Sequence, residues 1–265
     1  MKKLVSLTAV VACLALAPSA GAITFGQLDG NTHPNVGALF ADYDPEVPGP
    51  DFLCSGTLIS PTVFLTASHC TAFLTSVGVD PDEVFVSFSP DAANDDGSFR
   101  TGAQQLPGTY HTHPRFGPHF GDGDPHDIAV VVLDTAPRIT PARLPAAGSL
   151  SSLPRGQRLT SVGYGAHEVT NSPGGHQYLY DDVRMVATGT LHAVTPAWLR
   201  VSMNRATGDG GTCYGDSGGP NFLGDSDVVA ATTITGDAVC RATNVDYRLD
   251  TPSARDFLAT YVPLP

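Results

Sequence analysis

An eight-residue string around position 217 carries the most chemistry in this sequence. It reads Cys213-Tyr-Gly-Asp-Ser-Gly-Gly-Pro220. A serine hydroxyl is a weak nucleophile at neutral pH, so it needs a base to take its proton and donors to hold an oxyanion. Glycines beside a serine allow neighbouring backbone N–H groups to converge on one point. The string therefore predicts Ser217 as a nucleophile, with the N–H groups of Gly215 and Ser217 as oxyanion donors.

Two other segments contain the partners that such a serine requires. In Leu65-Thr-Ala-Ser-His69-Cys70 a histidine directly follows an apolar strand, and histidine is the usual general base near neutral pH. Asp127 precedes the apolar run Ile128–Leu133, so its carboxylate would be partly desolvated and would need a donor such as an imidazole N–H. We therefore predict His69 as the general base and Asp127 as the residue that orients it.

The composition favours short strands over long helices as the elements that position these side chains. Charged residues make up only 15% of the chain, which has 28 Gly and 22 Pro. Runs such as Val63–Thr66 and Val228–Thr235 mix β-branched and apolar residues between turn residues. One helix is expected at the end, where Thr251 can cap it and Pro252 suits its first turn. The sequence thus predicts an all-β protein with a C-terminal helix at about 252–262.

The first 22 residues are predicted to be a signal peptide. Lys2 and Lys3 precede an apolar run that reaches about Ala17, and Ala20-Gly-Ala22 fits a cleavage signal. A lipoprotein signal ending at Cys13 is the alternative, and it is disfavoured because the apolar run continues past that cysteine. No later run is long and apolar enough to span a bilayer. We expect a secreted chain, extracellular or periplasmic, with no membrane association.

The charge pattern argues against several classes of partner. A net charge of −12 disfavours nucleic acid and anionic membranes, which require clustered Lys and Arg. Asp91, Asp95 and Asp96 could ligate calcium, but their spacing differs from an EF-hand loop, and a solvated turn is the preferred interpretation. The histidine-rich segment 111–127 lacks helical zinc spacing. We expect no metal and no cofactor.

Four cysteines follow the predicted signal peptide: Cys54, Cys70, Cys213 and Cys240. An even number in an exported chain indicates two disulfides, and three pairings are open from the sequence alone. A zinc site is disfavoured because no close Cys-x-x-Cys pair is present.

The three chemical segments resemble a known family. Thr66-Ala-Ser-His-Cys70, Asp127-Ile-Ala and Gly215-Asp-Ser-Gly-Gly-Pro220 are similar to the signature motifs of the trypsin/chymotrypsin-like serine proteases, in that family's order. The resemblance implies two six-stranded antiparallel β-barrels with the active site between them. Here the first barrel would span about 23–137 and the second about 155–250, within a peptidase domain of 23–265. It also implies the disulfides Cys54–Cys70 and Cys213–Cys240, as in bacterial-type secreted members.

The same resemblance implies an activated N-terminus. Ile23-Thr-Phe-Gly26 is similar to the family's mature start, where a free α-amino group pairs with the acid that precedes the serine, Asp216 here. Such a pair would hold the oxyanion donors in their working shape, and a buried carboxylate needs a partner of this kind. Signal cleavage after Ala22 would itself expose Ile23, so no separate propeptide is expected.

The resemblance also implies a specificity pocket. Gly211 would form its base, and Gly236 and Val245 its walls, so that an uncharged pocket would favour small or medium apolar residues. Asp237 or Asp246 is the open alternative, because either acid could reach the pocket and restore a preference for basic residues.

These observations predict a secreted serine endopeptidase that acts through an acyl-enzyme, as a monomer, on protein or peptide substrates. One alternative is a non-catalytic trypsin-like binding protein, since a fold does not fix a function. Retention of His69, Asp127, Ser217, Gly215 and Asp216 argues against it. The other alternative is an esterase, whose Gly-x-Ser-x-Gly string Gly215–Gly219 matches superficially. The order of the three residues and the cysteine beside His69 argue against that.

Overall fold

Apolar strands in the first half of the chain close into a six-stranded antiparallel barrel. The computed structural model describes residues 23–47, 49–117, 123–172, 175–180 and 183–265, so the predicted signal peptide lies outside the described residues. The strand order is β2-β3-β4-β7-β6-β5, and β2 pairs with β5 to close the barrel. The strands are β2 (Val36–Ala41), β3 (Asp51–Ser60), β4 (Val63–Thr66), β5 (Val84–Ser87), β6 (Leu106–Thr112) and β7 (Ala129–Leu133).

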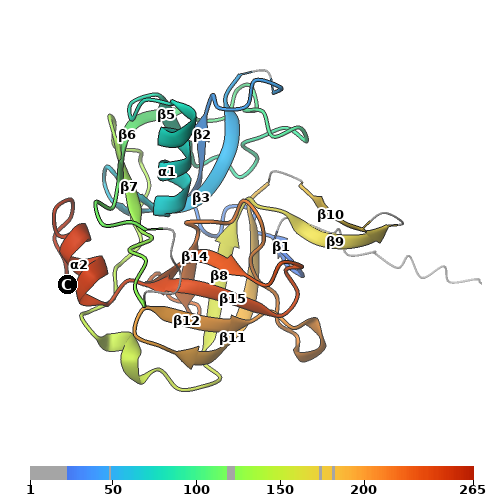
Figure 1. Ribbon diagram of the computed structural model, residues 1–265, viewed down its shortest axis with the longest axis vertical. Coiled ribbons are helices and arrows are strands. Elements are labelled where there is room, and N and C mark those ends of the chain that lie inside the picture. Colours follow the sequence, from blue (N-terminus) through green and yellow to red (C-terminus); the bar gives the residue numbers. More distant parts are fainter. Residues whose placement is uncertain (1–22, 48, 118–122, 173–174, 181–182) are drawn as a thin grey trace, which may run out of the picture.

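The second half of the chain forms a second antiparallel barrel, below the first in Figure 1. Its order is β8-β11-β12-β15-β14-β13, and β13 pairs back with β8. The strands are β8 (Arg158–Gly163), β11 (Met185–Val194), β12 (Trp198–Ser202), β13 (Pro220–Leu223), β14 (Val229–Gly236) and β15 (Thr243–Arg248). The short β1 (Gln27–Leu28) pairs with β11, and β9 (His167–Ser172) with β10 (Gly175–Leu179) forms a projecting hairpin. The predicted class, two six-stranded antiparallel barrels followed by a helix, is confirmed.

Helix α1 (Ser68–Val77) was not predicted from the sequence. It begins directly after β4 and holds His69 in its first turn. Ala67 precedes it without a side-chain cap, and Thr71 and Thr75 are β-branched, which weakens the helical signal. Gly78 ends the helix in the left-handed conformation.

A buried ion pair and a shared apolar core join the two barrels. Arg184, just before β11, contacts Asp29 at 2.9 Å, and its guanidinium also donates to the carbonyls of Val36 and Phe88 in the first barrel. Apolar residues of both barrels, among them Phe52 and Tyr164, belong to one buried cluster. These bonds supply acceptors for N–H groups of the buried guanidinium, as burial of a charge requires.

Helix α2 (Pro252–Leu258) covers the end of the first barrel that carries Asp127. Thr251 caps it as predicted, since its hydroxyl accepts from the N–H of Ala254. The helix ends four residues earlier than the predicted 262, because the N–H groups of Thr260 and Tyr261 donate three residues back, to Phe257 and Leu258, and the chain continues as tight turns. Two 3-10 turns, Ser149–Ser152 and Arg205–Thr207, complete the elements. Among the described residues, no helix is long and apolar enough to cross a membrane.

A stacked histidine pair ties α2 to the segment before Asp127. The rings of His113 and His126 stack at 4.8 Å, and His113 packs on Phe257 at 4.9 Å. His126 Nδ1 lies 2.6 Å from the Ser253 hydroxyl. His113 is buried, and its Nδ1 accepts from the N–H of Arg115.

We predict that His113 makes stability depend on pH. Burial, with added repulsion from His126 and Arg115, lowers the pKa of His113 from 6.5 to about 4. The unfolded chain therefore takes up this proton first, and the free energy of unfolding falls as the pH drops from about 6.5 toward about 4, by at most about 3 kcal/mol. His113→Phe should flatten this part of the profile. Denaturant titrations of both proteins at about pH 7 and about pH 4.5 measure it, and equal losses in the two proteins would contradict the prediction.

Candidate active site

Ser55 of β3 holds the Ser217 loop of the second barrel against the first barrel. Its N–H donates to the carbonyl of Ser217 at 3.0 Å, and its hydroxyl donates to the carbonyl of Gly215 at 3.2 Å. The same hydroxyl accepts from the N–H of Tyr164 at 3.0 Å. Ser55 is fully buried, so these bonds form out of water and fix the loop rigidly.

The glycines around Ser217 are required by close contact and by backbone conformation. Gly215 has φ +91° and Gly218 has φ +78°, a region that favours glycine. A Cβ added at Gly218 would lie 2.2 Å from Thr66 Oγ1 and 2.7 Å from the carbonyl oxygen of Ser55. The glycines of the string Cys213–Pro220 thus allow the backbone of the second barrel to contact the first barrel closely.

His69 and Asp127 form a two-point contact at the start of α1. The ring Nδ1 of His69 lies 2.9 Å from Asp127 Oδ2, and the N–H of His69 donates to Asp127 Oδ1 at 2.9 Å. Asp127 is fully buried, whereas the His69 side chain is 31% exposed. Ser68 adds a third link, because its hydroxyl donates to the carbonyl of Ile128 at 2.6 Å. The carboxylate therefore fixes both the position and the ring orientation of the histidine.

Ser217 and His69 line the same cavity. It has a volume of about 240 Å³. Its lining comprises His69, Thr212, Cys213, Tyr214, Ser217, Thr233, Ile234, Thr235, Gly236, Asp237 and Cys240. We call it the Ser217 cavity. Within the described residues no hydrogen bond links the Ser217 hydroxyl to the His69 ring, and such bonds are commonly long in an unliganded site.

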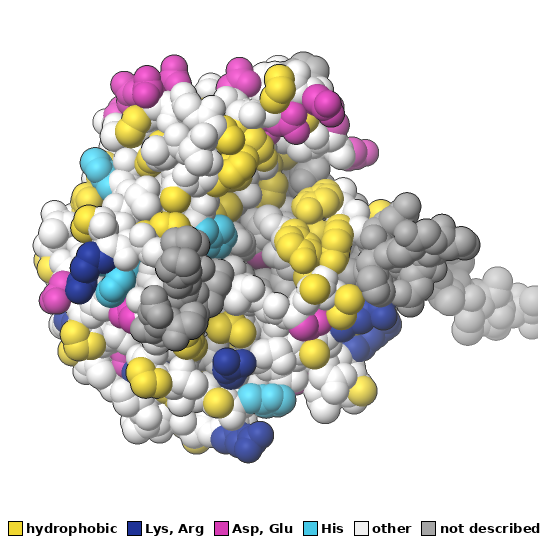
Figure 2. Space-filling model, viewed as in Figure 1, with side chains coloured by type: hydrophobic (Ala, Val, Ile, Leu, Met, Phe, Trp, Pro, Cys, Tyr) yellow, Lys and Arg dark blue, Asp and Glu magenta, His cyan; other side chains and the backbone are white. Residues whose placement is uncertain are grey.

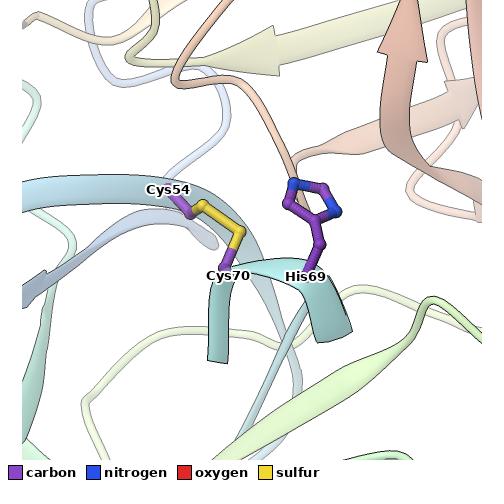
Figure 3. Close-up of side chains that lie close together, drawn as sticks. All are labelled: Cys54, His69 and Cys70. Carbon is purple, nitrogen blue, oxygen red and sulfur yellow. A yellow bond between two sulfur atoms is a disulfide. The ribbon is translucent and has the colours of Figure 1, made fainter. Parts of the chain in front are cut away.

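Two disulfides flank the chemical segments. They join Cys54 to Cys70 and Cys213 to Cys240, the pairings that the resemblance implies. Figure 3 shows the His69 ring and the Cys70 sulfur leaving the same turn of α1. Cys54, His69 and Cys70 are also the one group of potential metal ligands that cluster within the described ranges. Since both sulfurs are in a disulfide, the group offers no thiolate.

Asp216 is a buried carboxylate whose described partners are all backbone N–H groups. It accepts from Cys213 and Gly165, each at 2.9 Å. Burial raises the pKa of Asp216 to about 7, against the lowering effect of these two bonds. Ile23 is also fully buried, and the next residue, Thr24, pairs with Gly211. The first described residues are thus docked on the second barrel near the Ser217 loop.

The three predicted pocket residues occupy different places. Gly236 lines the Ser217 cavity. Gly211 does not line it and packs against Asn244 instead, because a Cβ added there would lie 2.7 Å from Asn244 Nδ2. Val245 is half-buried in β15 and pairs with Arg200 and Thr235.

The two acids left open for the pocket also differ. Asp237 lines the Ser217 cavity, but its oxygens accept from the N–H groups of Arg241, Ala242 and Thr243. Burial and these bonds act in opposite directions, and the net effect lowers the pKa of Asp237. Asp246 is fully buried inside the second barrel with neither oxygen hydrogen-bonded. Burial raises its pKa well above the ordinary value, because a buried charge without donors is disfavoured.

Sequence reasoning missed Ser55 and Asn244. Ser55 lies within strand β3 and Asn244 within strand β15. Asn244 is buried with both amide atoms unpaired, and it meets Gly211 from a distant part of the chain. No local pattern signals either contact, because both depend on how the strands align.

The two barrels, together with a histidine that a buried aspartate holds on the same cavity as a serine, define the class of protein. A sequence model described as Trypsin matches residues 41–257, and the chain belongs to the trypsin family. The resemblance drawn from the sequence is thereby confirmed. Over 183 residues the chain is 27% identical to Glucanase inhibitor protein 1 of Phytophthora sojae, and the aligned region covers 67% of this chain but only 65% of that protein.

The fold is similar to a solved structure of HL collagenase. The TM-score is 0.65, and the alignment covers 94% of this chain and 100% of that one. Sequence identity is 16%, so this similarity concerns the fold alone.

We predict that Gly218→Ala destabilises the protein far more than the same change at Gly102. Both glycines have positive φ, +78° and +92°, but an added Cβ at Gly102 meets open space. The first variant should lose about 3 kcal/mol of unfolding free energy and the second about 1 kcal/mol. Denaturant titration measures both, and equal losses would show that contact between the barrels is not the cause.

Proposed function

We propose that this chain is a secreted serine endopeptidase that cleaves peptide bonds through an acyl-enzyme. The observation that carries the proposal is the two-point contact of His69 with buried Asp127, on the wall of the cavity that also contains Ser217. In that arrangement the Ser217 hydroxyl attacks the scissile carbonyl while His69 Nε2 takes its proton. Asp127 holds the ring and stabilises the imidazolium that forms.

The remaining steps use groups of the same loop. The N–H groups of Gly215 and Ser217 donate to the oxyanion, and losing one such donor typically costs about 10²–10³ in rate. His69 then returns the proton to the leaving amine, and water releases the acyl group by the same route. Two disulfides support an oxidising compartment, and hence export.

The pocket beneath Ser217 supports a preference for small or medium uncharged residues. Apart from His69 and Asp237, the residues that line the Ser217 cavity are uncharged. Asp246 does not line it, and the oxygens of Asp237 already accept from three backbone N–H groups. The cavity therefore offers an arginine no carboxylate that lacks hydrogen-bond donors.

A second candidate function is protein binding without catalysis. It is favoured by one observation, the name of the relative Glucanase inhibitor protein 1, which describes an inhibitor. A binding surface has no need for a buried Asp127 that accepts twice from His69. A fluorophosphonate reagent separates the two candidates, because it reacts only with an activated serine.

Substitution of the three residues tests the proposed mechanism. Ser217→Ala, His69→Gln and Asp127→Asn should each lower casein hydrolysis by roughly 10⁴–10⁶-fold, because each removes a group used in the proton transfer. Ser226→Ala, an exposed serine in a turn, is the matched control and should retain full activity. Fluorophosphonate labelling should map to Ser217 by mass spectrometry. Unchanged hydrolysis by Ser217→Ala would remove the proposal.

The N-terminus supplies a further test. We propose that cleavage after Ala22 frees the α-amino group of Ile23 to pair with Asp216, whose pKa of about 7 in the present state reflects a carboxyl without a cation. A chain that begins at Ile23 should be active. A chain that keeps Ala22 should lose about 10²-fold or more in kcat/KM, since an unpaired buried charge costs about 3–5 kcal/mol. Equal activity of the two chains would contradict this pairing, as would a secreted protein whose mass places its start elsewhere.

A further inference from the structure

A second cavity lies close to the Ser217 cavity, since Gly215 lines it while the flanking Tyr214 and the nearby Ser217 line the first. Its volume is about 330 Å³. Its lining comprises Tyr43, Phe52, Leu53, Asp95, Asp96, Gly97, Tyr180 and Gly215, and we call it the rim cavity. Apart from Gly215, a proposed oxyanion donor, none of these residues takes part in the proposed mechanism. The rim cavity therefore offers a volume and side chains that the mechanism does not use.

Aromatic rings form one wall of the rim cavity. Phe52 is held between Phe40 and Tyr164, at ring distances of 6.0 and 6.2 Å. The Tyr43 hydroxyl donates to the carbonyl of Phe52 at 2.8 Å, which fixes the second ring. Tyr180 supplies a third, partly exposed ring. Fixed aromatic faces attract a cation through their negative π-electron density.

Carboxylates form the opposite wall. Asp95 and Asp96 are exposed, and hydrogen bonds from Ser98 lower the pKa of Asp96. Asp51 does not line the cavity, and burial raises the pKa of its carboxyl, so the charge of this wall comes from Asp95 and Asp96. The nearby Arg100 is already paired with Asp91 at 2.7 Å. The wall thus carries an excess of negative charge.

The charge of the whole first barrel adds to this local field. Residues 23–137 contain 15 Asp and Glu against two Arg, whereas residues 138–265 contain 11 against ten. Figure 2 shows acidic side chains gathered over the first barrel, with hydrophobic side chains in the middle of the same face. An excess of one sign around a cleft concentrates ligands of the opposite sign.

The position of the rim cavity indicates which part of a substrate would reach it. Under the proposed function, the residue that supplies the scissile carbonyl occupies the Ser217 cavity, next to Gly236. Gly215, a proposed oxyanion donor to that carbonyl, also lines the rim cavity, so the rim cavity would be within reach of the chain beyond the scissile bond. We propose that the rim cavity binds a positively charged side chain, arginine or lysine, on the leaving-group side of the substrate, an inference that rests on the proposed function.

Peptide pairs test this preference. Internally quenched peptides would share one acyl side and carry arginine, its uncharged isostere citrulline, or glutamate at the first, second or third position after the scissile bond. At one of these positions kcat/KM should be about tenfold higher for arginine than for citrulline, and lowest for glutamate. Equal values for arginine and citrulline at all three positions would overturn the inference.

Charge variants locate the effect. Asp95→Asn combined with Asp96→Asn should bring the ratio of arginine to citrulline close to one. Asp82→Asn combined with Asp134→Asn removes the same charge from exposed positions of the first barrel that do not line the rim cavity, and it should leave the ratio within about twofold of wild type. An equal loss in both double variants would assign the preference to the general field and overturn the cavity as its source.

A small amide substrate separates this inference from the proposed function. It has the same acyl side and a chromogenic amine as leaving group, so it has nothing to place in the rim cavity. The rate of its hydrolysis should be the same in the wild type and in both double variants. If it is cleaved while the peptides show no arginine preference, the inference fails and the proposed function stands. If neither it nor any peptide is cleaved, both fail.

Discussion

The candidate site depends on one buried contact between the barrels, where Ser55 bonds to the backbone of the Ser217 loop. The nucleophile candidate belongs to the second barrel and the His69–Asp127 pair to the first, so their relative position is a property of the junction. Three hydrogen bonds of Ser55 and the absence of a Cβ at Gly218 set that position. A shift at this junction would separate the histidine from the serine even with both barrels intact, and misplacement of about 1 Å can cost 10²-fold in rate.

The two barrels contribute different chemistry to the cleft. The first supplies the pair of His69 and buried Asp127 and most of the acidic residues, and the second supplies the Ser217 loop and most of the lining of the Ser217 cavity. Buried acids illustrate the division. Asp127 accepts two hydrogen bonds from His69, whereas neither oxygen of Asp246 has a hydrogen-bond partner, and burial raises the pKa of Asp246 well above its ordinary value. Burial alone therefore does not determine the pKa of a carboxyl group, because hydrogen-bond donors near it favour the charged form.

Sequence reasoning identified the residues whose signal is local. The strings around His69 and Ser217 and the cap at Thr251 could be recognised from neighbouring residues, and the family resemblance then gave the barrels. Helix α1 was missed because Ala67 offers no cap and threonines weaken its pattern. Ser55, Asn244 and the His113–His126 stack were missed for another reason: each contact joins segments far apart in the chain. Strand register, β-bulges and closure of the barrels decide such contacts, and none of these can be predicted from a single short segment of the sequence.

Because of the disulfide between Cys54 and Cys70, the position of His69 depends on whether these two cysteines are oxidised or reduced. The disulfide bonds β3 to the first turn of α1, one residue after His69. Without this bond, hydrogen bonds of Ser68, His69 and Thr71 hold that turn. The position of His69 is therefore less constrained when the two cysteines are reduced than when they are joined.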